Sequence, residues 1–383
     1  MSTALTPSAV SLPPATGAWR EGDPPGRRQW HVQEEPLALE AGGELPGVRL
    51  AFETWGRLAP DRSNAVLVLH ALTGDSHVSG AAGPAHPTPG WWNGLIGPGL
   101  ALDSDRWFVV APNVLGGCQG STGPSSTRPD GRTWGGSFPY LTQRDQVTAE
   151  ADVADALGID RWALVIGGSM GGMRALEWAV SHPERVASLL LLACPAAAGA
   201  EQIAYANIQL HAIRSDPGWH GGDYHDASPG NGPHTGLGLA RRLAHVTYRS
   251  ERELQTRFSR TPQGAEDPWH GGRFQVESYL DHHAAKLIRR FDAASYVVLT
   301  EAMNSHDIGR GRGGVQTALR RVTADTLVAG VDSDRLYPLS QQAELANGIT
   351  GSDRVRVIES PSGHDGFLNE TAQVSALISE LTD

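Results

Sequence analysis

The chain has few cysteines and no long apolar run, and each scarcity excludes a class of protein. Cys118 and Cys194 are the only cysteines among 383 residues. Two thiols in a chain of this length cannot supply the framework of a disulfide-stapled secreted fold, so we expect a reducing compartment. The most apolar stretch, residues 187–194, stops at Pro195. It is too short to cross a bilayer and is typical of a buried strand.

Basic charge is also scarce. Lys and Arg number 31 against 42 Asp and Glu, which gives a net charge of −11. A general nucleic-acid-binding protein needs a basic surface, so we expect no nucleic-acid partner. A small anionic substrate stays possible, because a local basic pocket can exist on an acidic protein. The first residues lack a basic segment followed by an apolar one, so we predict no signal peptide, no membrane partner and a cytoplasmic location.

The composition that is present indicates a loop-rich globular protein. Hydrophobic residues make up 40% of the chain, and there are 46 glycines and 25 prolines. This length suits one large domain or a core with an inserted subdomain. Residues 1–30 are rich in Pro, Gly and Ser, and they predict an extended N-terminal arm with little regular structure.

Short apolar runs alternate with helical patterns along much of the chain. Continuous apolar runs suit strands that are covered on both faces, as in a parallel sheet. Helical periodicity separates or follows several runs, which predicts a doubly wound α/β sheet. The predicted strands are residues 48–55, 65–69, 107–110, 162–166, 188–192, 326–331 and 355–359, and the clearest helices are residues 147–157, 170–181 and 369–381.

The middle of the chain has a different pattern. Residues 196–297 contain helix-like stretches at 203–213, 237–248 and 275–291, and no clear strand. We therefore predict an α/β core formed by residues 31–195 and 298–383, with residues 196–297 inserted as a helical lid.

The strongest local signal is the run Gly-Gly-Ser-Met-Gly-Gly at residues 167–172, which follows a predicted strand and opens a predicted helix. It fits the G-x-S-x-G nucleophile elbow, in which glycines let a strand and a helix meet closely around an exposed serine. The alternatives are a phosphate-binding turn or merely a tight turn. The strand–turn–helix context favours Ser169 as a nucleophile on an α/β-hydrolase fold.

A serine hydroxyl needs a base, and on this fold the acid and then the histidine follow the serine along the chain. Asp332 and Asp334 follow the predicted strand 326–331, and spacing alone does not separate them. His364 follows the last predicted strand and precedes the last helix. We expect His364 to take the proton of Ser169 and one of the two aspartates to orient the imidazole.

An oxyanion hole requires two backbone N–H groups. One comes from the residue after the nucleophile, here Met170, and the other from the loop after an early strand. Residues 70–74 follow the strand 65–69, and we assign the second donor to Leu72. His70 itself we interpret as a packing residue at the strand end.

Weaker clusters give no metal site. Residues 220–226 contain His and Asp in a glycine-rich loop, a pattern more typical of a solvated loop than of a metal site. Residues 281–283 suit a solvated helix face. Cys118 has no base placed for it, and we interpret it as a buried or loop thiol.

Several longer motifs together are far more specific than the elbow. They are residues 113–125, 138–142, 167–173, 239–242 with 247–250, and 332–338. In this combination the chain resembles the homoserine O-acetyltransferase family, from about residue 30 to the C-terminus. The loop at 216–236 is the part that matches least.

The resemblance implies a fold, an activity and roles for particular residues. It implies an α/β-hydrolase fold with a mostly parallel sheet, a helical lid over a tunnel, and a homodimer. The family transfers an acetyl group from acetyl-CoA to L-homoserine in methionine biosynthesis, with acetyl-CoA as co-substrate and no permanently bound cofactor. Its triad maps onto Ser169, Asp334 and His364, and its substrate-binding residues map onto Arg241 and Asp365. A guanidinium suits a carboxylate and a carboxylate suits an ammonium group.

The resulting hypothesis is a two-stage reaction through an acyl-serine. Four alternatives remain open at this point: a homoserine O-succinyltransferase, a serine O-acyltransferase, an esterase or thioesterase with the same triad, and a non-enzymatic binding protein. One or two pocket residues separate the transferases, because a methylene is worth only about 1–3 kcal/mol. Water access separates the transferases from the hydrolases.

Overall fold

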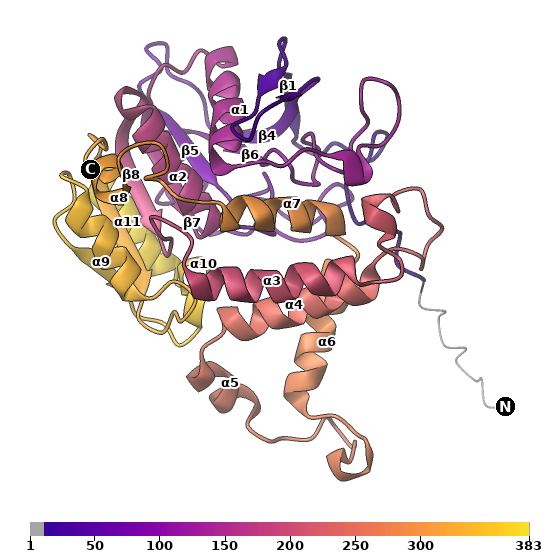
Figure 1. Cartoon of the computed structure of the whole chain (residues 1–383). Helices are drawn as coiled ribbons and strands as arrows, with labels where there is room; N and C mark the ends of the chain where they lie inside the picture. The colour runs from indigo at the N-terminus through magenta and orange to yellow at the C-terminus, as the bar shows by residue number, and fades with distance from the viewer. Residues whose placement is uncertain (1–10, 383) are drawn as a thin grey trace.

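A computed structural model describes residues 11–382, and its centre is one twisted sheet of eight strands (Figure 1). The strand order is β1-β4-β6-β5-β7-β8-β9-β10. The pairs β1–β4 and β4–β6 are antiparallel, and all the later pairs are parallel. The strands are β1 (Gln29–Val32), β2 (Leu37–Ala38), β3 (Glu44–Leu45), β4 (Arg49–Trp55), β5 (Ala65–Leu69), β6 (Phe108–Pro112), β7 (Trp162–Gly168), β8 (Val186–Leu192), β9 (Asp325–Val331) and β10 (Val355–Ile358), of which β2 and β3 form a separate hairpin.

Helices cover both faces of the sheet, which explains why its strands are apolar without alternation. In β5, Leu67 and Leu69 pack with residues of α1 and α2, whereas Val66 and Val68 pack with residues of α11. The helices are α1 (Gln143–Ala156), α2 (Met170–Ser181), α3 (Ala200–Arg214), α4 (His234–Tyr248), α5 (Glu251–Phe258), α6 (Gln275–Leu287), α7 (Ala293–Asn304), α8 (Val315–Leu319), α9 (Leu339–Gly348), α10 (Gly366–Asn369) and α11 (Thr371–Thr382).

A helical insertion, which we define as residues 200–304, separates β8 from β9 along the chain. Figure 1 shows α3 and α4 side by side, with α5 and α6 extending away from the sheet. The insertion has its own apolar cluster, which includes Leu210, Leu237 and Tyr296 and also takes in Leu72 and Met170 from the α/β part. The insertion is therefore packed directly over the loops that follow β5 and β7.

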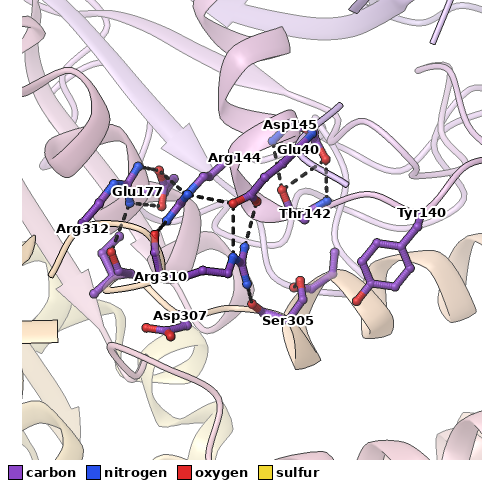
Figure 2. A network of polar contacts seen from close by, with 12 residues as sticks. Glu40, Tyr140, Thr142, Arg144, Asp145, Glu177, Ser305, Asp307, Arg310 and Arg312 are labelled. Atoms are coloured by element: carbon purple, nitrogen blue, oxygen red, sulfur yellow. Dashed lines mark hydrogen bonds and ion pairs between the residues drawn. The ribbon is translucent and has the colours of Figure 1, made fainter. Parts of the chain in front are cut away.

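A polar network fixes the chain where it leaves the insertion (Figure 2). Glu177 on α2 accepts hydrogen bonds from Arg312, one of them at 2.9 Å, and its carboxylate lies 3.6 Å from Arg144 Nε on α1. Glu40, between β2 and β3, pairs with Arg144 at 2.7 Å and with Arg310 at 2.8 Å. The network thereby ties α1 and α2 to the segment that follows α7.

The predicted fold class is confirmed, and the boundaries differ in detail. The helix α2 and the strand β5 have the predicted bounds, and most other elements differ by a few residues. A lid ending at residue 297 would cut through α7, which continues to Asn304. Residues 1–10 of the predicted arm lie outside the described residues. Residues 11–28 form no helix or strand, and Trp19 N–H donates to the carbonyl of Cys118.

None of the helices formed by residues 11–382 combines the length and the apolar character that a membrane crossing would require.

Candidate active site

Ser169 lies at the tight turn between β7 and α2. Its φ of 56° is a left-handed value that is strained for a residue with a side chain, and ψ is −124°. The turn is possible because the elements around it approach very closely. A Cβ on Gly167 would come within 2.0 Å of the Gly171 carbonyl oxygen, and a Cβ on Gly171 would come equally close to the Leu69 carbonyl oxygen. The sequence signal for a nucleophile elbow thus corresponds to a real steric requirement.

Asp334 and His364 form a buried hydrogen-bonded pair. Asp334 Oδ2 lies 2.7 Å from His364 Nδ1. The other oxygen, Oδ1, accepts from the N–H groups of Leu336 at 2.8 Å and Tyr337 at 3.0 Å. Both carboxylate oxygens are therefore held in place. Asp332 is used differently, since its side chain accepts from the N–H of Ser360 at 3.0 Å, so the structure brings Asp334, and not Asp332, to the histidine.

The environment of His364 poises it as a base. Burial disfavours the charged imidazolium, but the charge and hydrogen bond of Asp334 outweigh this and raise the pKa of His364 above its ordinary value. With Nδ1 donating to Asp334, Nε2 is the nitrogen left to take a proton. The ring centroid lies 5.3 Å from that of Phe367, and a Cβ on Gly168 would meet Phe367 at 2.4 Å. The same aromatic ring therefore contacts both the histidine and the residue before Ser169.

The two residues that we assigned to the oxyanion hole lie in one buried cluster. Leu72 is in the loop after β5 and Met170 is the first residue of α2, and their side chains belong to the same apolar cluster. A first-turn N–H has no acceptor within its own helix, so that of Met170 is free of the helical ladder. His70, by contrast, uses both ring nitrogens on backbone groups: Nδ1 on the Ala71 carbonyl at 2.8 Å and Nε2 on the Val114 N–H at 3.0 Å.

A buried ion pair lies behind the elbow. Arg174 on α2 and Glu150 on α1 are in direct contact, and neither side chain is exposed. Arg174 also donates to the carbonyl oxygen of His70 at 2.7 Å, and the Trp178 indole N–H donates to Glu150 at 2.9 Å. Sequence reasoning gave no signal for this pair. It connects the helix after Ser169 to the strand end that carries the loop of Leu72.

Arg241 and Asp365 line a common cavity of about 420 Å³ between the insertion and the loop after β5. Arg241 Nη1 donates to Thr73 Oγ1 at 3.3 Å, and its guanidinium lies 5.9 Å from the ring centroid of Tyr248. Tyr248 is in turn 5.7 Å from the His364 ring, and Asp365 directly follows His364 in the chain. The two predicted substrate-binding residues are thus brought together beside the predicted base.

Asp365 already has a partner within the protein, which sequence reasoning missed. Its Oδ2 lies 3.1 Å from Arg249 Nη2, and Arg249 also pairs with Glu253 at 3.2 Å. Tyr248 was missed as well. Tyr248 and Arg249 lie in the motif at 247–250, which contributes to the family resemblance but whose sequence alone does not indicate a role for either residue.

A second and much smaller cavity, about 40 Å³, lies against Leu72, Met173, Tyr248 and Tyr337. None of the described residues that line it is charged. It therefore offers a small uncharged space beside the elbow helix and the loop that carries Asp334.

One group of possible metal ligands comes together among the described residues: Glu53, His77 and His86. Glu53 lies 3.3 Å from His77 Nδ1 and 3.2 Å from His86 Nε2, and it accepts from Ser76 Oγ at 3.0 Å. Burial acts to raise the pKa of Glu53, but the hydrogen bonds from both histidines outweigh it and lower the pKa to about 2. The Arg28 guanidinium lies 3.4 Å from the remaining nitrogen of His86 and opposes a second cation. These contacts describe an internal polar network that supports the loop after β5.

The weaker candidates from the sequence are dispersed. In the loop at 220–226, His225 Nε2 lies 3.0 Å from Asp292 Oδ1, and the hydroxyl of Tyr224 donates to the same oxygen at 2.7 Å. Asp281 pairs with Arg242 at 2.7 Å. Cys118 is buried, and burial raises the pKa of its thiol to about 12, so it is a poor nucleophile.

Comparisons with known proteins agree with this geometry. Residues 64–371 match the family described as alpha/beta hydrolase fold. The chain is 73% identical over 368 residues to the homoserine O-acetyltransferase of Thermobifida fusca (strain YX), covering 96% of this chain and 97% of that protein. A crystal structure of homoserine O-acetyltransferase from Bacillus anthracis superposes with a TM-score of 0.84 at 27% identity, covering 93% of this chain and 97% of that one. The esterase E22 superposes with a TM-score of 0.83 at 24% identity, covering 93% and 99%, which shows the fold alone.

The fold and the elbow define an α/β hydrolase, a class that carries out acyl transfer as well as hydrolysis. Within that class, the extent and level of identity are decisive. The chain belongs to the homoserine O-acetyltransferase family.

Proposed function

We propose that the protein transfers an acetyl group from acetyl-CoA to the hydroxyl of L-homoserine, through an acetyl-serine intermediate, to give O-acetyl-L-homoserine for methionine biosynthesis. The observation that carries the proposal is the buried Asp334–His364 hydrogen bond of 2.7 Å at the carboxyl edge of the sheet that presents Ser169. Family membership supplies the reaction class, and the cavity contacts support the substrate. We place the enzyme in the cytoplasm.

In the first half-reaction Ser169 takes the acetyl group. Nε2 of His364 removes the hydroxyl proton as Oγ attacks the thioester carbonyl carbon, and the charge on the imidazolium is stabilised by Asp334. The N–H groups of Leu72 and Met170 stabilise the oxyanion, and loss of one such donor typically costs about 10²–10³ in rate. The carbon–sulfur bond then breaks, and His364 returns the proton to the sulfur of the departing CoA.

In the second half-reaction homoserine accepts the group. His364 removes the proton of the homoserine hydroxyl, and the oxygen attacks the acetyl carbonyl. The bond to Ser169 breaks, and the proton passes from His364 to the serine oxygen. The ester leaves and the enzyme returns to its starting state, so no oxidant, metal or further cofactor is needed.

Recognition of the acceptor rests on the cavity between the insertion and the sheet. The Arg241 guanidinium, beside Thr73 and Tyr248, suits the homoserine carboxylate, because it has no carboxylate partner among the described residues. Asp365 suits the ammonium group, which would share the carboxylate with Arg249. A serine acceptor is shorter by one methylene, and this contact pair would then hold its hydroxyl farther from Ser169.

The small cavity beside Leu72 and Met173 favours acetyl over succinyl as the transferred group. Its volume of about 40 Å³ suits a methyl group, and its described lining residues carry no charge. A succinyl chain directed into this cavity would place its carboxylate among residues that carry no cation to pair with it.

A transferase has a requirement that the helical insertion can meet. An acetyl-serine that waits for homoserine must be protected from water. Gly363, next to His364, packs so closely on α4 that a Cβ there would come within 2.4 Å of the Tyr248 carbonyl oxygen. We therefore propose that the helical insertion, residues 200–304, acts as a lid on the α/β core.

We also propose that the enzyme is a homodimer. Four large apolar side chains on α3 and α4 are exposed: Ile203, Ile208, Leu239 and Val246. Two adjacent helices with such residues on their outer side provide a surface for a second copy. Sedimentation velocity at several concentrations tests this, and a monomer at all of them contradicts it.

The decisive experiment is mass spectrometry of the intact protein after mixing with acetyl-CoA. We expect an adduct of one acetyl group, carried by the peptide that contains Ser169, absent in Ser169→Ala, and removed by L-homoserine with formation of the ester. Succinyl-CoA and L-serine provide the matched comparisons for donor and acceptor. An adduct that decays in water as fast as in homoserine would make the protein an esterase instead.

A further inference from the structure

Some of the cations that line the cavity with Arg241 and Asp365 are paired with a carboxylate of the protein, and others are not. Arg249 and Arg290 are paired within the protein, Arg249 with Asp365 at 3.1 Å and Arg290 with Asp75 at 3.4 Å. Arg241 and Lys286 are not paired with any carboxylate in the part of the chain that the structure describes. Two cations of this cavity are therefore free to take negative charge from a ligand.

The two unpaired cations differ in position. Arg241 is half-buried, on α4, and contacts Thr73 and Tyr248 close to His364. Lys286 is exposed, in the last turn of α6, next to the buried Leu287 that lines the same cavity. Arg241 thus lies at the inner end of the cavity and Lys286 at its rim.

Lys286 is also the only lysine in the sequence, beside 30 arginines. An ammonium group on a flexible stem binds phosphate as a point charge from many directions, whereas a guanidinium favours a fixed planar geometry. The histidines nearby do not add charge. Burial and the charge of Arg241 lower the pKa of His245 to about 2 and that of His283 to about 4.

The two substrates of the proposed reaction carry their negative charges at different distances from the reacting atoms. The carboxylate of homoserine lies a few bonds from its hydroxyl. The phosphates of an acyl-CoA lie at the far end of the pantetheine arm from the thioester, so they stay outside when the thioester reaches Ser169. Arg241, at the inner end of the cavity, is placed for the carboxylate of homoserine. Lys286, at the rim, is placed for the phosphates of the acyl-CoA.

We propose that Lys286 binds the phosphate groups of the acyl-CoA donor at the cavity rim, leaving Arg241 for the acceptor. The inference rests on the proposed function and adds the place where the nucleotide end of the donor is held. The simpler explanation is that a lysine in the last turn only stabilises the C-terminal end of α6. That explanation predicts an effect on stability, and none that depends on which donor is used.

Kinetics with two donors separate these explanations. In Lys286→Gln we expect the KM for acetyl-CoA to rise about tenfold, as for loss of one charge-assisted contact. The KM for homoserine and the rate with the acetyl thioester of N-acetylcysteamine, which lacks phosphates, stay unchanged. Lys286→Arg restores most of the acetyl-CoA KM. Arg354→Gln is the matched control, an exposed cation just before the amino end of β10. An equal change with both donors, or no change with either, overturns the proposal.

Chemical labelling gives a second measurement that does not require turnover. Because Lys286 is the only side-chain amine, an amine-acylating reagent modifies this residue and the α-amino group alone. We expect CoA to slow the labelling of Lys286 about tenfold and to leave the α-amino group unaffected, while pantetheine protects neither. Equal protection by pantetheine, or no protection by CoA, overturns the proposal. If CoA protects Lys286 but acetyl-CoA never acetylates Ser169, the proposed function fails and the binding site stands.

Discussion

Two arginine-rich regions of the molecule differ in how their cations are paired. In the network of Figure 2, Arg144, Arg310 and Arg312 share Glu40 and Glu177, so every guanidinium has a carboxylate. In the cavity between the insertion and the sheet, Arg241 and Lys286 have none among the described residues. Both regions join the insertion to the α/β part, and they differ in whether each cation has a carboxylate partner.

The difference separates structural charges from binding charges. A paired cation directs its hydrogen bonds to the protein itself, and removing its partner leaves a charge without compensation. A half-buried cation without a partner has lost part of its hydration, and no carboxylate of the protein compensates for that loss. An anionic ligand would supply the missing negative charge. The comparison therefore predicts that changes in the network affect stability, and that changes in the cavity affect substrate binding.

The largest effect on activity is expected at Asp334, whose paired charge takes part in the proposed reaction. In Asp334→Asn we expect kcat to fall about 10³–10⁴-fold, because the imidazole loses its orientation and its counter-charge. The reaction needs neutral His364, and Asp334 raises the pKa of that histidine. The wild-type rate therefore falls as pH decreases through a pKa above the ordinary histidine value, and the variant's acidic limb moves to lower pH. Profiles of kcat/KM from about pH 5 to 9 measure this.

Asp332→Asn is the matched control for that change. Its carboxylate accepts from the N–H of Ser360 and does not contact His364. We expect a rate within a few-fold of wild type and an unmoved acidic limb. If Asp332→Asn loses as much activity as Asp334→Asn, the assignment of the acid is wrong.

The second largest effect is expected on homoserine binding, when the unpaired Arg241 is replaced. In Arg241→Gln we expect the KM for homoserine to rise about 10²-fold, since a charged contact with the substrate carboxylate is lost. The burst of CoA release that reports acetylation of Ser169 stays unchanged, as does the melting temperature. Arg242→Gln is the control, because its neighbouring guanidinium pairs with Asp281 at 2.7 Å. A similar rise in both variants would contradict a specific role for Arg241.

The sequence could predict candidate catalytic residues because topology limits where such residues can lie. Ser169, Asp334 and His364 each follow a strand, and the carboxyl ends of parallel strands meet at one edge of the sheet. Separating Asp334 from Asp332 required either the family resemblance or the geometry, because residues two apart share the same strand end. The positions of Arg241 and Asp365 came from the resemblance alone.

The end of the helical insertion and the charged lining of the cavity depend on tertiary packing, which no local sequence pattern indicates. The helix α7 is buried over most of its length, so it has no polar face, and the predicted boundary at residue 297 fell inside it. No local pattern in the sequence assigns a role to Lys286 or Arg249. Only the folding of α4 and α6 over the loop after β5 brings them to one cavity.

Within the network, Glu177 offers the sharpest test of the structural side of the comparison. Its side chain is 2% exposed and is shared by Arg312 and Arg144. In Glu177→Gln we expect the free energy of unfolding to fall by about 2 kcal/mol, because two arginines lose their common acceptor charge. Urea denaturation measures this. Both KM values stay unchanged at 25 °C, and a rise in the homoserine KM would show that the network also shapes the cavity.

The smallest effect is expected at the exposed end of the same network. Arg310 pairs with Glu40 at 2.8 Å, but its side chain is 39% exposed. Exposed pairs contribute about 0–1 kcal/mol and weaken with salt, and Arg144 still holds Glu40 when Arg310 is removed. We expect Arg310→Gln to lower the free energy of unfolding by less than about 1 kcal/mol, with most of the difference lost in added salt. A salt-independent loss as large as that of Glu177→Gln would mean that the network acts as one cooperative unit, in which exposure does not set the value of a single pair.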